Sequence, residues 1–240
     1  MVGKIFLLEH LKKLTEPNRV CDSHSKSKKM SETKVREDIC KLGKSLFDRG
    51  FTVGSSGNIS VRLGDGNWIM TPTNSCLGRL DPAQLSLVDS RGNLLSGDAP
   101  TKESFLHLAV YEKRESANAI VHLHSTHSVA VSILPDINPD EPIPPITAYY
   151  VMKIGKLALL PYYAPGDATL ASAVREVAGK HHAILLANHG PIVAGKSLED
   201  AVYASEELEE TSKIYLMIKN QSPRILNKDE VQNLTDRWAN

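Results

Sequence analysis

The chain has 240 residues, and its 28 Lys and Arg residues balance its 28 Asp and Glu residues, so the formal net charge is zero. That balance excludes the strongly basic surface of a typical nucleic-acid-binding protein, and no apolar run approaches the roughly 20 residues of a membrane span. We therefore expect neither a nucleic-acid partner nor a membrane partner. The apolar fraction of 41% is that of a globular protein, and the length favours one sizeable domain.

The ends of the chain differ in composition from its middle. A polar, basic stretch over residues 21–29 is typical of disorder. We expect residues 1–30 to be a disordered or dispensable extension, residues 31–225 to form the folded domain, and residues 226–240 to form a C-terminal tail.

The cysteines indicate a reducing compartment. Cys21, Cys40 and Cys76 are odd in number and show no Cys-x-x-Cys spacing. This pattern argues against a disulfide framework and against a cysteine-based zinc site. We expect reduced thiols and a cytoplasmic location.

The first part of the folded region predicts one helix and two hairpins. Ser31 offers an N-cap, apolar residues then recur at helical spacing, and Gly50 ends the helix. A Gly-Asp-Gly-Asn turn at residues 64–67 joins two alternating segments. The expected strand pairs are residues 59–63 with 68–71 and residues 85–88 with 93–95.

The second part alternates helices and short strands, which predicts an α/β fold with an antiparallel-rich central sheet flanked by helices. The longest helix carries the acidic run Glu206–Glu210, which is read as a solvated face. The expected elements are a helix at about 102–113, a strand at 119–124, a short helix at 128–134, a proline-rich excursion at 135–145, a strand at 156–161, a helix at 169–179, strands at 183–187 and 192–194, and a helix at 198–219.

The histidines give the sharpest chemical signal. His122 and His124 are two residues apart on an expected strand, so their side chains point to one face. His189 follows the buried strand at 183–187 and is placed to reach into a cleft. Three imidazoles would leave the fourth position of a tetrahedral zinc ion open for substrate. His127 could extend this cluster or face away from it.

Glu103 lies where a helix begins. A carboxylate at this position stabilises the helix dipole, so a capping role is one reading. The other reading is an acid or base, or a fourth metal ligand. Glu103 also shares a helix face with His107, and the two side chains could pair with each other.

Two loops are rich in hydrogen-bond donors, namely Gly57-Asn58 and the segment 71–74. Loops of this kind can surround a phosphate with N–H groups. With Lys102 nearby, they would form an anion pocket that the zero net charge conceals.

Together these motifs resemble the class II (zinc-dependent) aldolase family of fuculose- and ribulose-phosphate enzymes, over about residues 31–219. That family has, in order, a Gly-Asn loop, a Thr-Pro-Thr loop, a Glu at a helix start, a His-x-His strand and a late Asn-His-Gly. In this chain the motifs are Gly57-Asn58, Thr71-Pro72-Thr73, Glu103, His122 with His124, and Asn188-His189-Gly190.

The resemblance implies an αβα sandwich and a homotetramer with sites at subunit interfaces. It makes His122, His124 and His189 the ligands of one Zn²⁺ per subunit, with another divalent metal as the alternative. Glu103 becomes the catalytic acid/base, which can also touch the metal. The implied phosphate-binding residues are Gly57, Asn58, Thr73, Asn74, Thr101 and Lys102.

Further segments resemble one subgroup, the 3-oxo-tetronate 4-phosphate decarboxylases; they are residues 75–81, 149–152, 161–167 and 206–211. This implies decarboxylation of a phosphorylated sugar acid to dihydroxyacetone phosphate and CO2 through a zinc-stabilised enediolate. Lys102 would recognise the substrate carboxylate or phosphate. The alternatives are a sugar-phosphate aldolase, a pentulose-phosphate 4-epimerase and, more remotely, an adducin-like interaction module. Which tyrosine assists protonation stays open among Tyr149, Tyr150, Tyr163 and Tyr203.

Overall fold

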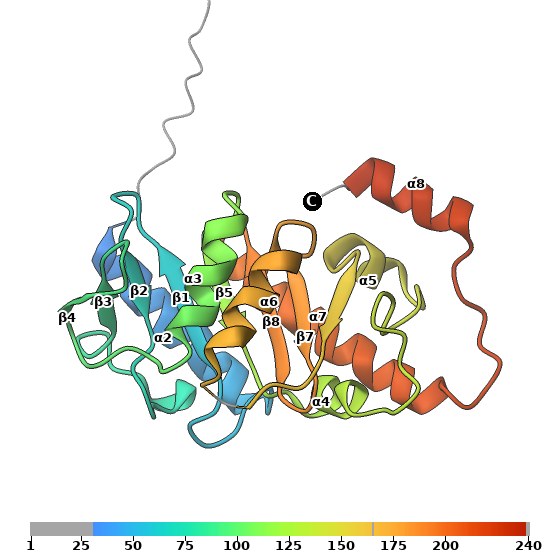
Figure 1. The fold of residues 1–240 in the computed structure, drawn as a ribbon, viewed down its shortest axis with the longest axis horizontal. Coiled ribbons are helices and arrows are strands. Elements are labelled where there is room, and N and C mark those ends of the chain that lie inside the picture. Colours follow the sequence, from blue (N-terminus) through green and yellow to red (C-terminus); the bar gives the residue numbers. More distant parts are fainter. Residues whose placement is uncertain (1–30, 165, 239–240) are drawn as a thin grey trace, which may run out of the picture.

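A computed structural model describes residues 31–164 and 166–238, so the expectations for residues 1–30, including Cys21, lie outside the described residues. The centre is an eight-stranded sheet (Figure 1). Its neighbouring strands are antiparallel except for one parallel pair at the edge, so the antiparallel-rich sheet is confirmed. Across the sheet the order is β4 (Leu94–Ser96), β3 (Ser86–Val88), β2 (Trp68–Met70), β1 (Asn58–Arg62), β5 (Ala119–His122), β8 (Gly190–Gly195), β7 (Ala183–Leu186) and β6 (Leu157–Leu160).

Helices cover both faces of this sheet, which makes the expected αβα sandwich (Figure 1). One face packs against α3 and α6, and the other against α2, α4 and α7. Of the remaining elements, η2 contacts α2, and α5 contacts α7 and α8. The bounds are α2 (Glu32–Asp48), η2 (Leu77–Arg79), α3 (Ser104–Lys113), α4 (Thr126–Ser132), α5 (Ala148–Lys153), α6 (Ala168–Ala178), α7 (Leu198–Ile218) and α8 (Lys228–Trp238).

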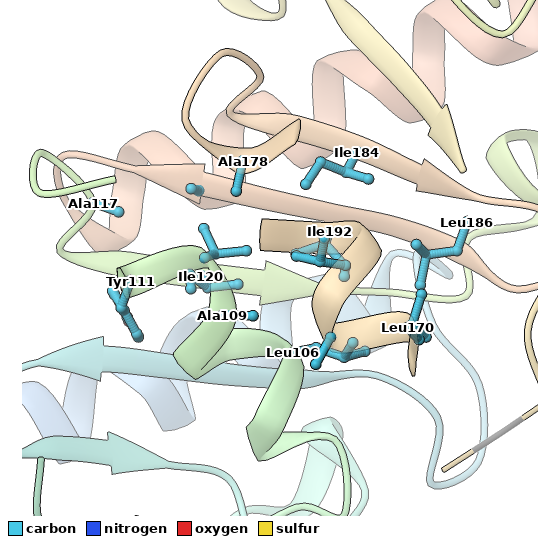
Figure 2. Close-up of a cluster of buried hydrophobic side chains, with 14 of the residues drawn as sticks. Leu106, Ala109, Tyr111, Ala117, Ile120, Leu170, Ala178, Ile184, Leu186 and Ile192 are labelled. Carbon is cyan, nitrogen blue, oxygen red and sulfur yellow. The ribbon is translucent and has the colours of Figure 1, made fainter. Parts of the chain in front are cut away.

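The central strands are apolar on both faces because both faces are covered. In β7, Ile184 and Leu186 point toward α3 and α6, where they meet Leu106 and Leu170 (Figure 2). Leu185 points the other way, toward α7. Each fully buried side chain of this kind stabilises the fold by about 1.5–3 kcal/mol. The sandwich therefore holds the strand ends, and the side chains at those ends, in fixed positions.

The predicted elements agree with the structure except at several boundaries. The helix expected from residue 102 begins at Ser104, and the strand expected to reach residue 124 ends at His122. The expected tail contains α8, which contacts α5, and just before it the Leu226 N–H donates to the Pro145 carbonyl. Within the described residues, no helix combines the length and hydropathy that a bilayer crossing requires. Cys40 and Cys76 are free.

The acidic run in α7 is not a uniformly solvated face, which corrects the sequence reading. Glu209 is only 9% exposed. Its carboxylate accepts hydrogen bonds from the backbone N–H groups of His127 and Ser128, at 2.8 and 2.9 Å, and from the Ser128 hydroxyl at 2.8 Å. Glu209 therefore satisfies the free N–H groups at the start of α4, the helix that follows His124.

Candidate active site

Four side chains converge at one end of the central strands. His122 ends β5, His124 follows it, His189 lies between β7 and β8, and Glu103 directly precedes α3. One ligand atom from each lies within 4.8 Å of the others. The His122 and His124 Nε2 atoms are 3.1 Å apart, and Glu103 Oε1 lies 3.1 Å from His189 Nε2. The structure thus brings together all four residues that the sequence assigned to the metal.

A backbone contact orients His122. Its Nδ1 lies 2.9 Å from the Pro191 carbonyl oxygen, so Nδ1–H donates and the Nε2 lone pair faces the cluster. Burial, together with the neighbouring His124 and His189, lowers the pKa of His122 to about 3, although Glu103 opposes the shift. Burial also lowers the pKa of His124. Both rings are therefore neutral near neutral pH, which is the form that binds metal.

Glu103 does not serve as a helix cap. It occupies the N-cap position of α3 but makes no side-chain capping bond. Burial acts to raise the pKa of Glu103, but the neighbouring His189 and His122 and the hydrogen bond from Asn58 outweigh burial and lower it. Asn58 Nδ2 donates to Glu103 Oε2 over 2.7 Å. Glu103 is therefore held as a carboxylate beside the three imidazoles.

The expected pairing of Glu103 with His107 is also corrected. His107 Nε2 lies 2.5 Å from Asn58 Oδ1, so Asn58 stands between the two. Asn58 is buried, and both polar atoms of its side chain are engaged. Its carboxamide thus has a role that the sequence reading, which assigned it to phosphate, did not foresee.

The donor set fits a divalent metal. Three imidazole nitrogens with one carboxylate suit zinc and, less selectively, manganese, cobalt or iron. His122, His124 and His189 would hold the ion, and Glu103 could touch it. The ion would supply Lewis acidity toward a carbonyl oxygen.

The backbone around His189 requires glycine. Gly190 has φ of 147°, and a Cβ at this position would lie 2.2 Å from the Leu123 carbonyl oxygen. Asn188 has φ of 59°, the left-handed region that Asn tolerates better than most residues. The Asn-His-Gly motif therefore lets the β7–β8 turn pass close to β5, which brings His189 to His122.

The donor-rich loop at residues 71–74 lies beside the segment at residues 99–101, which precedes Glu103. The Thr101 N–H donates to the Thr71 carbonyl over 3.1 Å, and the Thr73 N–H donates to the Ala99 carbonyl over 2.9 Å. This pairing leads directly into Glu103. Of the residues assigned to phosphate here, Asn74 and Lys102 are exposed. Gly57 approaches the end of β5, since a Cβ on it would lie 3.0 Å from the His122 carbonyl oxygen.

Other residues that the sequence singled out have partners elsewhere. His127 Nδ1 lies 2.8 Å from Glu209 Oε1, so it does not extend the metal cluster. The Tyr150 hydroxyl is buried and donates to the Ile143 carbonyl, which leaves it unavailable for protonating a substrate.

The comparison with protein-family models shows the family of this chain. Residues 37–216 match the Class II Aldolase and Adducin N-terminal domain family. The chain belongs to this family. The match lies inside the expected folded domain, residues 31–225.

Two curated relatives within this class II aldolase family have different activities. A Haemophilus influenzae protein named 3-oxo-tetronate 4-phosphate decarboxylase is 46% identical over 208 residues, which are 87% of this chain and 99% of the relative. A Methanococcus maripaludis protein named L-fuculose phosphate aldolase is 37% identical over 76% of this chain and 94% of its own. Among solved structures, Escherichia coli YgbL is 45% identical with a TM-score of 0.83, over 85% of this chain and 98% of YgbL. The fold is therefore that of class II aldolases.

Proposed function

We propose that this protein is a metal-dependent decarboxylase that converts 3-oxo-tetronate 4-phosphate into dihydroxyacetone phosphate and CO2. The observation that carries the proposal is the complete cluster of His122, His124, His189 and Glu103 in a chain that is 46% identical to a relative of that name. The complete cluster also favours an enzyme over an adducin-like interaction module.

The substrate is a β-keto acid, so the bond between its carboxyl carbon and C2 is the one that breaks. CO2 leaves, and the bonding electron pair stays on the former C2 in conjugation with the ketone. A divalent metal, when bound, supplies the Lewis acidity that draws this charge toward the ketone oxygen. Glu103 passes a proton from solvent to the former C2, which becomes the CH2OH carbon of the product.

The phosphate of the substrate would lie against the paired loops beside Glu103. Backbone N–H groups, threonine hydroxyls and one lysine suit a phosphate. The Lys102 ammonium is exposed next to Glu103 and can reach the substrate carboxylate or phosphate. The proposed phosphate site comprises Gly57, Thr73, Asn74, Thr101 and Lys102, with Asn58 reassigned to Glu103.

Three further features belong to the proposal. We infer Zn²⁺, one per subunit, because three imidazole ligands with an open fourth position suit this ion. We infer a homotetramer with sites at subunit interfaces, and a cytoplasmic location, from the resemblance to the class II aldolases and from the reduced cysteines. Metal analysis and sedimentation of the purified protein test the first two.

An aldolase is the second candidate, because the chain is also 37% identical to a relative named L-fuculose phosphate aldolase. The discriminating experiment gives zinc-loaded protein, in separate assays, 3-oxo-tetronate 4-phosphate, L-fuculose 1-phosphate and a pentulose phosphate. CO2 from 3-oxo-tetronate 4-phosphate, with no aldehyde from L-fuculose 1-phosphate, supports the decarboxylase. Aldehyde without CO2 supports the aldolase, and interconversion of pentulose phosphates with neither product supports the 4-epimerase.

A further inference from the structure

A row of buried polar side chains extends from Glu103 into the interior. Its members come from two facing elements, β1 and α3. Asn58 and Ser60 lie two residues apart on β1, and His107 and Tyr111 lie four apart on α3, so each pair shares one face. All four side chains are buried. Four polar groups in one row between a sheet and a helix require a complete hydrogen-bond pattern.

The distances supply that pattern. Asn58 Nδ2 lies 2.7 Å from Glu103 Oε2, and Asn58 Oδ1 lies 2.5 Å from His107 Nε2. His107 Nδ1 lies 2.7 Å from Ser60 Oγ, which in turn lies 2.9 Å from the Tyr111 hydroxyl. Every polar side-chain atom of Asn58, Ser60, His107 and Tyr111 therefore takes part in the row.

The carboxylate fixes the direction of every bond. An ionised Glu103 only accepts, so the Asn58 NH2 group must face it and Asn58 Oδ1 must face His107. Oδ1 only accepts, so His107 carries its proton on Nε2. His107 Nδ1 is then an acceptor for the Ser60 hydroxyl, and the Ser60 oxygen accepts from Tyr111.

The far end of the row is closed by packing. The Tyr111 ring stacks on Trp68 with centroids 5.7 Å apart, and the Arg62 guanidinium lies 4.8 Å from the Tyr111 ring centroid. Figure 2 shows Tyr111 on the inner side of α3, beside the apolar core. The row is thus anchored at both ends.

We propose that His107 is a positioning residue for Glu103, acting through the Asn58 carboxamide. An Asn58 side chain free to rotate could turn its Oδ1 toward the carboxylate, which would repel it. The His107 Nε2–H prevents this, because the rotated amide would place its NH2 group against that N–H. Glu103 therefore keeps one donor on Oε2, while Oε1 faces His189. The inference rests on the proposed role of Glu103 in proton transfer.

Two substitutions of His107 separate the two ring nitrogens. In His107→Gln the side-chain NH2 group can take the place of Nε2–H and donate to Asn58. In His107→Asn the shorter side chain places its amide near Nδ1, beside Ser60, and leaves Asn58 without a donor. The two variants are otherwise alike in polarity and neutrality, so they control for each other.

The expected result is a difference in kcat between the variants. His107→Gln keeps kcat within about threefold of the wild type, whereas His107→Asn lowers it about 30- to 100-fold, because a misplaced catalytic group costs rate rather than affinity. KM stays unchanged in both variants. The amount of bound zinc, measured by mass spectrometry, also stays unchanged. Equal kcat values in the two variants would overturn the proposal.

A second measurement does not depend on activity or on the variants folding. Nitrogen-15 NMR of wild-type protein labelled in its imidazoles reports which nitrogen of His107 carries the proton. The proposal requires Nε2–H in the zinc-loaded protein, and a proton on Nδ1 contradicts it. If the wild type releases no CO2, the proposed function fails, whereas the NMR result still decides the hydrogen-bond row.

Discussion

The imidazole Nδ1 of His122 lies 2.9 Å from the carbonyl oxygen of Pro191, and this bond aims Nε2 at the metal cluster. Pro191 lies in β8, directly beside β5 in the sheet. The neighbouring strand therefore helps to fix the orientation of the His122 ring. A metal ion meets a ligand that is already neutral and oriented.

Removing a histidine from the cluster should weaken metal binding strongly. His124→Ala deletes one of three imidazoles, so we expect zinc affinity to fall at least about 100-fold, the size seen even for weaker changes around metal sites. His181→Ala is the matched control, because His181 Nδ1 bonds to the Lys156 carbonyl away from the cluster. Isothermal titration with zinc measures both. Equal zinc affinity in the two variants would show that the ion binds elsewhere.

Glu103→Gln should separate metal binding from catalysis. The amide keeps the shape of the side chain but cannot carry the proton, so we expect kcat to fall about 100- to 10,000-fold. Zinc content should stay near the wild-type value because the three imidazoles remain. Glu115→Gln, at an exposed position beyond α3, is the control for kinetics and zinc content. A Glu103→Gln variant with near wild-type kcat would remove Glu103 from proton transfer.

The convergence of the candidate metal ligands could be predicted from the sequence, because the direction of side chains along a strand depends only on local geometry. Side chains two residues apart on a strand point to the same face of the sheet. His122 and His124 do converge, although the strand itself ends at His122. The Asn-His-Gly motif placed His189 correctly for a similar reason, since the turn demands glycine at a fixed position.

The role of Asn58 could not be predicted, because its partners are 45 and 49 residues away on α3 and its N-cap. The burial of Glu209 could not be predicted for the same reason, because its partners are on α4, far from it along the chain. Local pattern shows which face a residue occupies, but only the packed fold shows what that face meets. The matching spacings of Asn58 with Ser60 and of His107 with Tyr111 were the available signal.

The burial of His107 should make stability depend on pH. Burial lowers the pKa of His107 to about 4 from its ordinary 6.5, although nearby Glu103 opposes the shift. The unfolded chain binds the proton more tightly, so the free energy of unfolding falls as pH falls from about 6.5 toward 4. On acidification from about pH 7 to about pH 5, His107 alone should lower the free energy of unfolding by about 2 kcal/mol.

Urea unfolding of chelator-treated wild type and His107→Gln at both pH values measures this effect. The other titrating groups are common to both proteins, so the difference in pH dependence belongs to His107. We expect the variant to lose about 2 kcal/mol less than the wild type on acidification. Parallel losses in the two proteins would mean that His107 is not held neutral.

Glu209→Gln should destabilise the fold. The amide replaces one acceptor oxygen with a donor that faces N–H or O–H groups at the start of α4. Leaving such buried groups unpaired should lower the free energy of unfolding by about 2 kcal/mol. Glu210→Gln, one residue along α7 and exposed, should change it by less than about 0.5 kcal/mol. Equal losses in the two variants would show that Glu209 does not anchor α4.

The most direct test of the account is the reaction of zinc-loaded wild-type protein with 3-oxo-tetronate 4-phosphate in D2O, followed by NMR of the product. The account predicts CO2 and dihydroxyacetone phosphate with one deuterium at the former C2 in a single configuration, because Glu103 delivers the proton from one side. Two results would contradict the account. One is a product that forms no faster than without protein and carries deuterium in both configurations, and the other is no release of CO2.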